Sequence, residues 1–181
     1  MFDPEQRSRL FNFALRAQSI FGGVMGIIIV WSLYSLMFTD YSHIFISKVL
    51  LTMICFGFAI ITPLIDFNES HATNPLWTGH ARFHLVWQVN AMILTAFLCL
   101  TLLWIFDSYL NVLLVVALNY LWIFSFIATA VSIKLYDGEF NDINGVPPIK
   151  FNFLGKEIEL DMNIQAISAV FVINSYALFI F

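Results

Sequence analysis

The sequence predicts an all-α integral membrane protein, a five-helix transmembrane bundle with a short β-hairpin before the last helix. Of its 181 residues, 60% are hydrophobic and only 11% are charged, whereas soluble domains carry about 25% charged residues. The mean hydropathy is +0.85. Five apolar stretches are each long enough to cross the hydrocarbon core of a bilayer, which takes about 20 helical residues. We find no sign of a second domain, so residues 1–181 are predicted to form a single transmembrane domain.

The five spans follow one another with short polar connections, except before the last. They are expected at about residues 17–39, 44–65, 80–106, 112–133 and 162–181. A four-plus-one arrangement, with the last helix packed peripherally, is the alternative. The composition excludes other classes: no basic patch with interleaved aromatic residues suggests nucleic acid, and two cysteines within apolar runs do not form a disulfide framework.

The first span follows an amphipathic lead-in over residues 4–16, which is expected to lie on the membrane surface. Within the span, Gly22 and Gly26 form a G-x-x-x-G pattern. Small residues at this spacing let two helices approach closely. The pattern therefore indicates a possible contact with a second copy of the chain or with another protein.

The middle spans carry a few polar residues whose positions have structural meaning. Lys48 lies near the start of span two and can extend to the interface. Pro63 in its last turn is expected to kink or end the helix. Thr78 is a suitable N-cap for span three. Asn119, deep in span four, is expected to bond a neighbouring helix.

The loop over residues 134–161 is the largest segment outside the spans. It contains the turn dipeptides Asp137-Gly138 and Asn144-Gly145. Apolar and polar residues then alternate from Ile149 to Leu160 around Gly155-Lys156, which predicts a β-hairpin. An isolated hairpin is only marginally stable in water, so we expect it to lie on the bundle or on a partner.

The distribution of basic residues predicts the orientation of the chain. Five spans place the N-terminus, the segment before span three and the 134–161 loop on one side. Seven basic residues fall on that side and only Lys48 on the other. Because basic loops stay on the cytoplasmic side, the N-terminus is expected in the cytoplasm.

Residues 66–84 contain three of the four histidines, although the flanking sequence is apolar. His80 and His84 are four apart at a helix start, so their rings share one face. A helix N-terminus disfavours the imidazolium form, and a metal ion requires the neutral ring. With His71 and Glu69 as further ligands, the set fits a divalent metal, zinc or non-haem iron.

The remaining polar residues of this stretch are expected to support that metal site. Asp66, Asn68 and Gln88 are placed around the ligands, with Asp66 holding a ring N–H. Gln88 extends the histidine stripe, which should point into the bundle. As an enzyme, the protein would act on a lipid-like substrate, with Glu69 as ligand or general base and Arg82 as a catalytic group that holds a phosphate or carboxylate.

Residues 68–71 (N-E-x-H) and 74–84 (N-P-x-W-x-x-H-A-R-F-H) resemble a signature of small, uncharacterised polytopic membrane proteins. The resemblance implies that this stretch works as one unit, and it implies no activity.

Several alternatives stay open from the sequence. The stretch could serve acid–base or ligand-binding chemistry without a metal, or form a structural network at headgroup level. The chain could be a non-enzymatic subunit or assembly factor that docks through the 134–161 loop or through Gly22 and Gly26. It could be a small transporter, although the spans lack midplane charges. Four histidines are too few for the two irons of membrane hydroxylases and desaturases.

Overall fold

The computed structural model describes residues 8–141 and 145–181. Its described part contains five helices that are long and apolar enough to cross a membrane. An antiparallel hairpin precedes the last helix. The predicted five-helix fold is therefore confirmed. The first residues of the predicted lead-in, 4–7, and Asn144 of a predicted turn lie outside the described residues.

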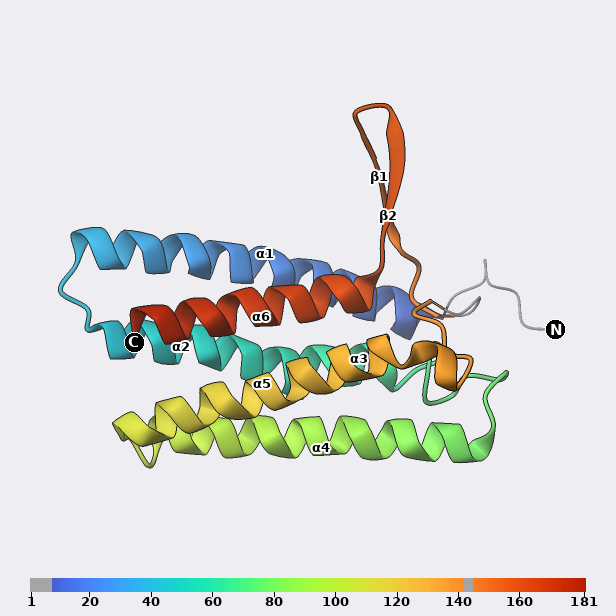
Figure 1. Cartoon of the computed structure of the whole chain (residues 1–181), viewed down its shortest axis with the longest axis horizontal. Helices are drawn as coiled ribbons and strands as arrows, with labels where there is room; N and C mark the ends of the chain where they lie inside the picture. The colour runs from blue at the N-terminus through green and yellow to red at the C-terminus, as the bar shows by residue number, and fades with distance from the viewer. Residues whose placement is uncertain (1–7, 142–144) are drawn as a thin grey trace.

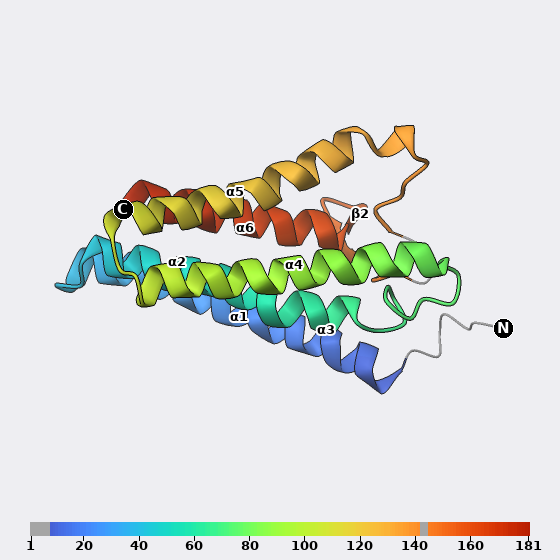
Figure 2. The same ribbon diagram turned by 90° about the horizontal axis from the view of Figure 1, so that it is seen from below.

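The helices run lengthwise beside one another, and the chain reverses direction after each span (Figures 1 and 2). The second span consists of three consecutive segments: α2, the π-helical segment η1, and α3. A short 3-10 helix, η2, follows the fourth span, α5. The helical elements are α1 (Arg9–Phe38), α2 (His43–Phe56), η1 (Gly57–Ile61), α3 (Thr62–Asp66), α4 (Gly79–Trp104), α5 (Tyr109–Val131), η2 (Ile133–Leu135) and α6 (Met162–Ile180).

Side-chain caps set the helix starts. Thr78 accepts a hydrogen bond from Ala81 N and caps α4 as predicted, and Ser108 accepts from Asn111 N. The Ser108 cap starts α5 at Tyr109, earlier than expected. The described part of the lead-in is continuous with the first span, so α1 is a single helix of 30 residues, about 45 Å long. It exceeds the roughly 30 Å hydrocarbon core by several turns.

A π-helical turn distorts the second span one turn before Pro63. The Thr62 N–H donates to Gly57 O, five residues back. Proline has no N–H to donate and its ring crowds the preceding turn, so the widened turn absorbs the defect. At Gly57 an added Cβ would lie 3.5 Å from the Phe21 ring of α1, so the Phe21 side chain packs directly on the second span at this point.

The centre of the bundle is α2, which contacts α1, α4, α5 and α6. The last helix packs against α2 and α5 rather than peripherally, which argues against the four-plus-one alternative. Buried polar bonds fix its position: Ser47 Oγ donates to Ala177 O at 2.9 Å, and Asn119 Nδ2 donates to Asn174 Oδ1 at 3.0 Å. The expected bond from Asn119 to a neighbouring helix is thus confirmed.

The hairpin consists of β1 (Ile149–Phe153) and β2 (Lys156–Leu160). Leu154 and Gly155 occupy the turn with φ values of 50° and 77°, one residue earlier than the sequence pattern suggested. Nearly all of its side chains are exposed. The hairpin extends away from the bundle, across the direction of the helices (Figure 1), instead of lying on it.

Candidate functional site

The polar segments gather at one end of the bundle, which we call the connector end. Figure 2 shows the start of α1, the connector between α3 and α4, and the loop that leads to the hairpin at this end. The connector, residues 67–78, belongs to the stretch that the sequence singled out. The turns after α1 and α4 lie at the opposite end.

A hydrogen-bonded network gives the connector its shape. Asn68, Ser70 and Asn74 are each at most 2% exposed. Asn68 Nδ2 donates to Leu64 O at 2.8 Å, and Asn68 Oδ1 accepts from Ser70 N at 2.9 Å. Asn74 Nδ2 donates to Ser70 O at 3.1 Å. Asn68 thus satisfies a carbonyl at the end of α3, and Asn74 satisfies a carbonyl within the connector. Asn68 therefore orders the connector.

Glu69 joins the connector to the first helix. Its Oε1 accepts from the Ser8 amide at 2.8 Å and its Oε2 accepts from the Ser8 hydroxyl at 2.7 Å. Ser8 in turn caps α1 by accepting from Phe11 N. A carboxylate at this position also interacts favourably with the positive end of the helix dipole.

His71 lies within the connector network. Its Nδ1 is 2.8 Å from Ser70 Oγ and 3.6 Å from Asp66 Oδ1. Its ring meets the Trp77 ring edge-on, with centroids 5.4 Å apart. The structure thus brings Asp66 beside a histidine ring, as the sequence suggested, but that ring belongs to the connector.

His80 and His84 form a pair on the first turns of α4. Their Nε2 atoms lie 3.0 Å apart, and their ring planes are perpendicular. This distance fits an N–H···N hydrogen bond in which one tautomer donates. It also fits two nitrogens on one zinc ion, because bond lengths of about 2.1 Å place such nitrogens roughly 3–3.5 Å apart.

The histidine stripe points away from the bundle, contrary to expectation. His80, His84 and Gln88 are all exposed, because the buried side of α4 is a different stripe that contains Val89, Ala96, Cys99 and Leu103. The exposed Phe83 and Trp87 flank His84, with ring centroids 5.7 and 5.9 Å from it. Exposed aromatic residues at a helix end are typical of the membrane interface.

Arg82 lies two residues from each histidine. Residues two apart on a helix do not face each other, so the backbone geometry turns the half-buried Arg82 away from the pair. Within residues 8–141 and 145–181 no group of three or more His, Cys, Asp or Glu side chains is arranged to hold a metal ion. The predicted ligands therefore form two centres, the His80–His84 pair and the connector network that holds Glu69 and His71.

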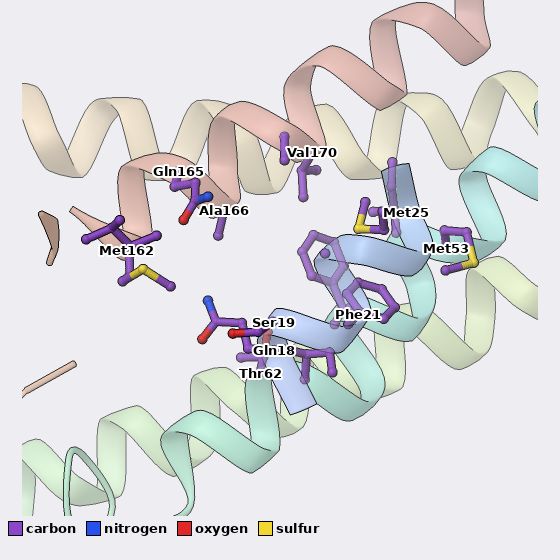
Figure 3. Close-up of a pocket in the computed structure, with 17 residues that line it drawn as sticks. Gln18, Ser19, Phe21, Met25, Met53, Thr62, Met162, Gln165, Ala166 and Val170 are labelled. Atoms are coloured by element: carbon purple, nitrogen blue, oxygen red, sulfur yellow. The ribbon is translucent and has the colours of Figure 1, made fainter. Parts of the chain in front are cut away.

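Sequence reasoning missed a cavity of about 430 Å³ near the connector end. It lies between α1, the distorted second span and α6, and Figure 3 shows its side chains facing one another. Gln18, Ser19, Thr62 and Gln165 are its polar lining residues. A glutamine inside an apolar span was the available signal, but the partners from other helices are visible only in the fold.

The fold and this end of the bundle define a multi-pass α-helical membrane protein. Comparisons with family models, with curated proteins and with solved structures find no match.

Proposed function

We propose that this chain is a multi-pass membrane protein that binds a divalent metal ion through His80 and His84. The observation that supports it is the 3.0 Å separation of the two Nε2 atoms. Both rings are exposed, so an ion can reach them without unfolding α4. With the N-terminus in the cytoplasm, as the basic residues predict, the ion would bind on the cytoplasmic side.

The depth of the pair fits chemistry at the headgroup level. The 26 residues of α4 extend about 39 Å, which exceeds the roughly 30 Å hydrocarbon core. This excess of about 9 Å, or roughly six residues, allows the first turns of α4 to project into the interface, where the exposed Phe83 and Trp87 are suited to lie.

Two imidazoles leave coordination positions open on the metal ion. Zinc takes four ligands, and catalytic sites keep one position for water or substrate. Glu69 and His71 could complete the set only after leaving Ser8 and Ser70, which costs their hydrogen bonds. Water or the oxygen of a lipid headgroup reaches the open positions without that cost. An ion held this way would polarise a headgroup carbonyl or phosphoryl oxygen, which is how an enzyme for lipid-like substrates would work.

Metal analysis of the tag-free chain tests this proposal. We expect about one zinc ion per chain after dialysis of the detergent-purified protein against zinc. His80→Ala and His84→Ala should each lose most of it. His43→Ala is the matched control, because His43 is an exposed histidine at the opposite end of the bundle. Equal zinc content in all four proteins contradicts the proposal.

A second candidate is a non-enzymatic subunit, which the hairpin favours. Its register places Ile149, Phe151 and Ile158 on one face, and each is more than a third exposed. Such an exposed apolar face is typical of an interaction surface. Purification of the native complex tests this role. If a partner binds the hairpin, it should elute with the wild-type chain and be lost from Phe151→Ser. A wild-type chain that always elutes alone argues against a partner at the hairpin.

A further inference from the structure

The β-hairpin lies at the level of the membrane surface. The last span, α6, has 19 residues and extends about 28 Å, which nearly matches the roughly 30 Å hydrocarbon core. Its first residue, Met162, therefore marks an edge of that core, and β2 ends at Leu160, two residues earlier. In both views the hairpin stays level with the start of α6 along the helix direction (Figures 1 and 2). It therefore extends along the membrane surface and past the edge of the bundle.

The two faces of the hairpin differ in chemistry. Side chains alternate along each strand, and residues directly opposite each other share a face. One face carries five apolar side chains and, beside the turn, one lysine: Ile149, Phe151, Phe153, Ile158, Leu160 and Lys156. The other face carries only polar side chains: Lys150, Asn152, Glu157 and Glu159. The hairpin is therefore amphipathic, as segments that lie in a membrane interface are.

Ile149 indicates which way the apolar face is turned. It lines the cavity near the connector end, and the other residues that line this cavity belong to α1, to the second span and to α6. The face that carries Ile149 is therefore turned toward the spans and the bilayer in which they lie, and the polar face is turned toward water. Lys156 fits this orientation, because a lysine can lay its stem on apolar surface and keep its ammonium at the headgroups.

The bundle leaves the apolar face largely uncovered, since Phe151 is 44% and Phe153 is 57% exposed. A two-stranded hairpin needs packing against its hydrophobic face to be stable, and aromatic side chains favour the membrane interface. We infer that this face docks on the lipid surface of the membrane that the chain spans, with Phe151 and Phe153 inserted among the headgroups. The docking does not depend on the metal ion proposed at α4, because the hairpin extends on the side of the bundle away from α4 (Figure 1). It leaves no apolar surface free for a protein partner, so the test must separate the two roles.

Spin labelling of the full chain in phosphatidylcholine vesicles tests the inference. Phe151→Cys places the label on the apolar face, and Asn152→Cys, one residue further along the same strand, is the matched control on the polar face. Oxygen concentrates in lipid and a nickel chelate stays in water, so their collision rates report the surroundings of each label. We expect oxygen collisions to dominate at position 151 and nickel collisions at position 152. The chain without an added cysteine gives the background from the buried Cys55 and Cys99.

A second pair on β2 repeats the measurement with Phe151 intact. Ile158→Cys should behave as position 151 does, and Glu157→Cys as position 152 does. The labels on the apolar face should lie about 5–10 Å into the boundary between headgroups and acyl chains, the depth that interfacial segments reach. Nickel collisions that are equal on both faces would place the whole hairpin in water and overturn the inference. Labels at positions 151 and 158 that neither reagent reaches would show that protein covers the face, which also overturns it.

Discussion

Glu69 accepts both the amide N–H and the hydroxyl of Ser8, a residue 61 positions earlier in the chain. These two hydrogen bonds hold the connector against the start of α1, while the hydrogen bond from Asn68 holds it against the end of α3. The connector is thus held by two different spans. This arrangement explains why a polar segment keeps a defined conformation at the end of an apolar bundle.

Replacement of Glu69 should weaken the contact between the connector and α1 without loss of the zinc ion proposed at His80 and His84. Glu69→Ala is expected to lower the free energy of unfolding by about 1 kcal/mol, a usual value for the loss of a helix cap. Hydrogen exchange at the first turn of α1 should rise. Zinc content should stay at the wild-type level, because His80 and His84 carry the ion. Loss of zinc in this variant would show that Glu69 is a ligand, contrary to the two-histidine site.

The buried asparagine pair should contribute to the packing of α5 on α6. Asn174→Ala removes the acceptor for Asn119 Nδ2 and the donor to Val116 O. Hydrogen bonds between transmembrane helices contribute about 0.6 kcal/mol on average, so a loss of about 1 kcal/mol is expected for the two. A double-mutant cycle with Asn119→Ala in detergent measures the coupling, and strictly additive losses would argue against the bond.

A single substitution should stabilise the turn of the hairpin. Leu154 and Gly155 both have positive φ, the conformation of a type I′ turn, for which Asn-Gly is preferred. Leu154→Asn should therefore slow proteolysis of the hairpin, and Gly155→Val should speed it. Faster proteolysis of Leu154→Asn than of Gly155→Val would mean that the turn has another conformation.

Alkaline pH should weaken the hairpin at its charged face. Glu159 beside Lys150 raises the pKa of the Lys150 ammonium above its usual value. A raised pKa stabilises the folded hairpin fully below the usual lysine pKa, and the effect disappears as the pH rises through the folded value. The Hα chemical shifts of β1 and β2, which do not depend on base-catalysed amide exchange, should therefore move toward unfolded-chain values only at strongly alkaline pH. Glu159→Gln should remove this pH dependence.

The orientation can be measured by cysteine labelling. Cys55 and Cys99 are buried, so they give little background. Thr73→Cys in the connector and Ser108→Cys at the opposite end both introduce exposed positions. We expect a membrane-impermeant reagent, added outside intact cells, to label only position 108. Labelling of position 73 instead would reverse the orientation and place the histidine pair outside.

Helix positions could be predicted from the sequence because caps and span lengths are local. Thr78 indicated where α4 begins, and the hydrophobic length indicated how far each span extends. The direction of the histidine stripe could not be predicted. In a membrane bundle the lipid-facing and core-facing sides are both apolar, so the pattern around His84 does not distinguish them. The positions of Glu69 and Gln18 depend on contacts with other helices, which no local pattern contains.

X-ray absorption spectroscopy of the zinc-loaded, tag-free protein tests the proposed metal site most directly. We expect two imidazole nitrogens at about 2.0–2.1 Å from zinc, the usual bond length, with oxygen donors in the remaining positions. Both nitrogens should disappear in the His80→Ala/His84→Ala double variant. A wild-type spectrum without imidazole ligands, or an unchanged spectrum in the double variant, would show that His80 and His84 do not bind the zinc ion.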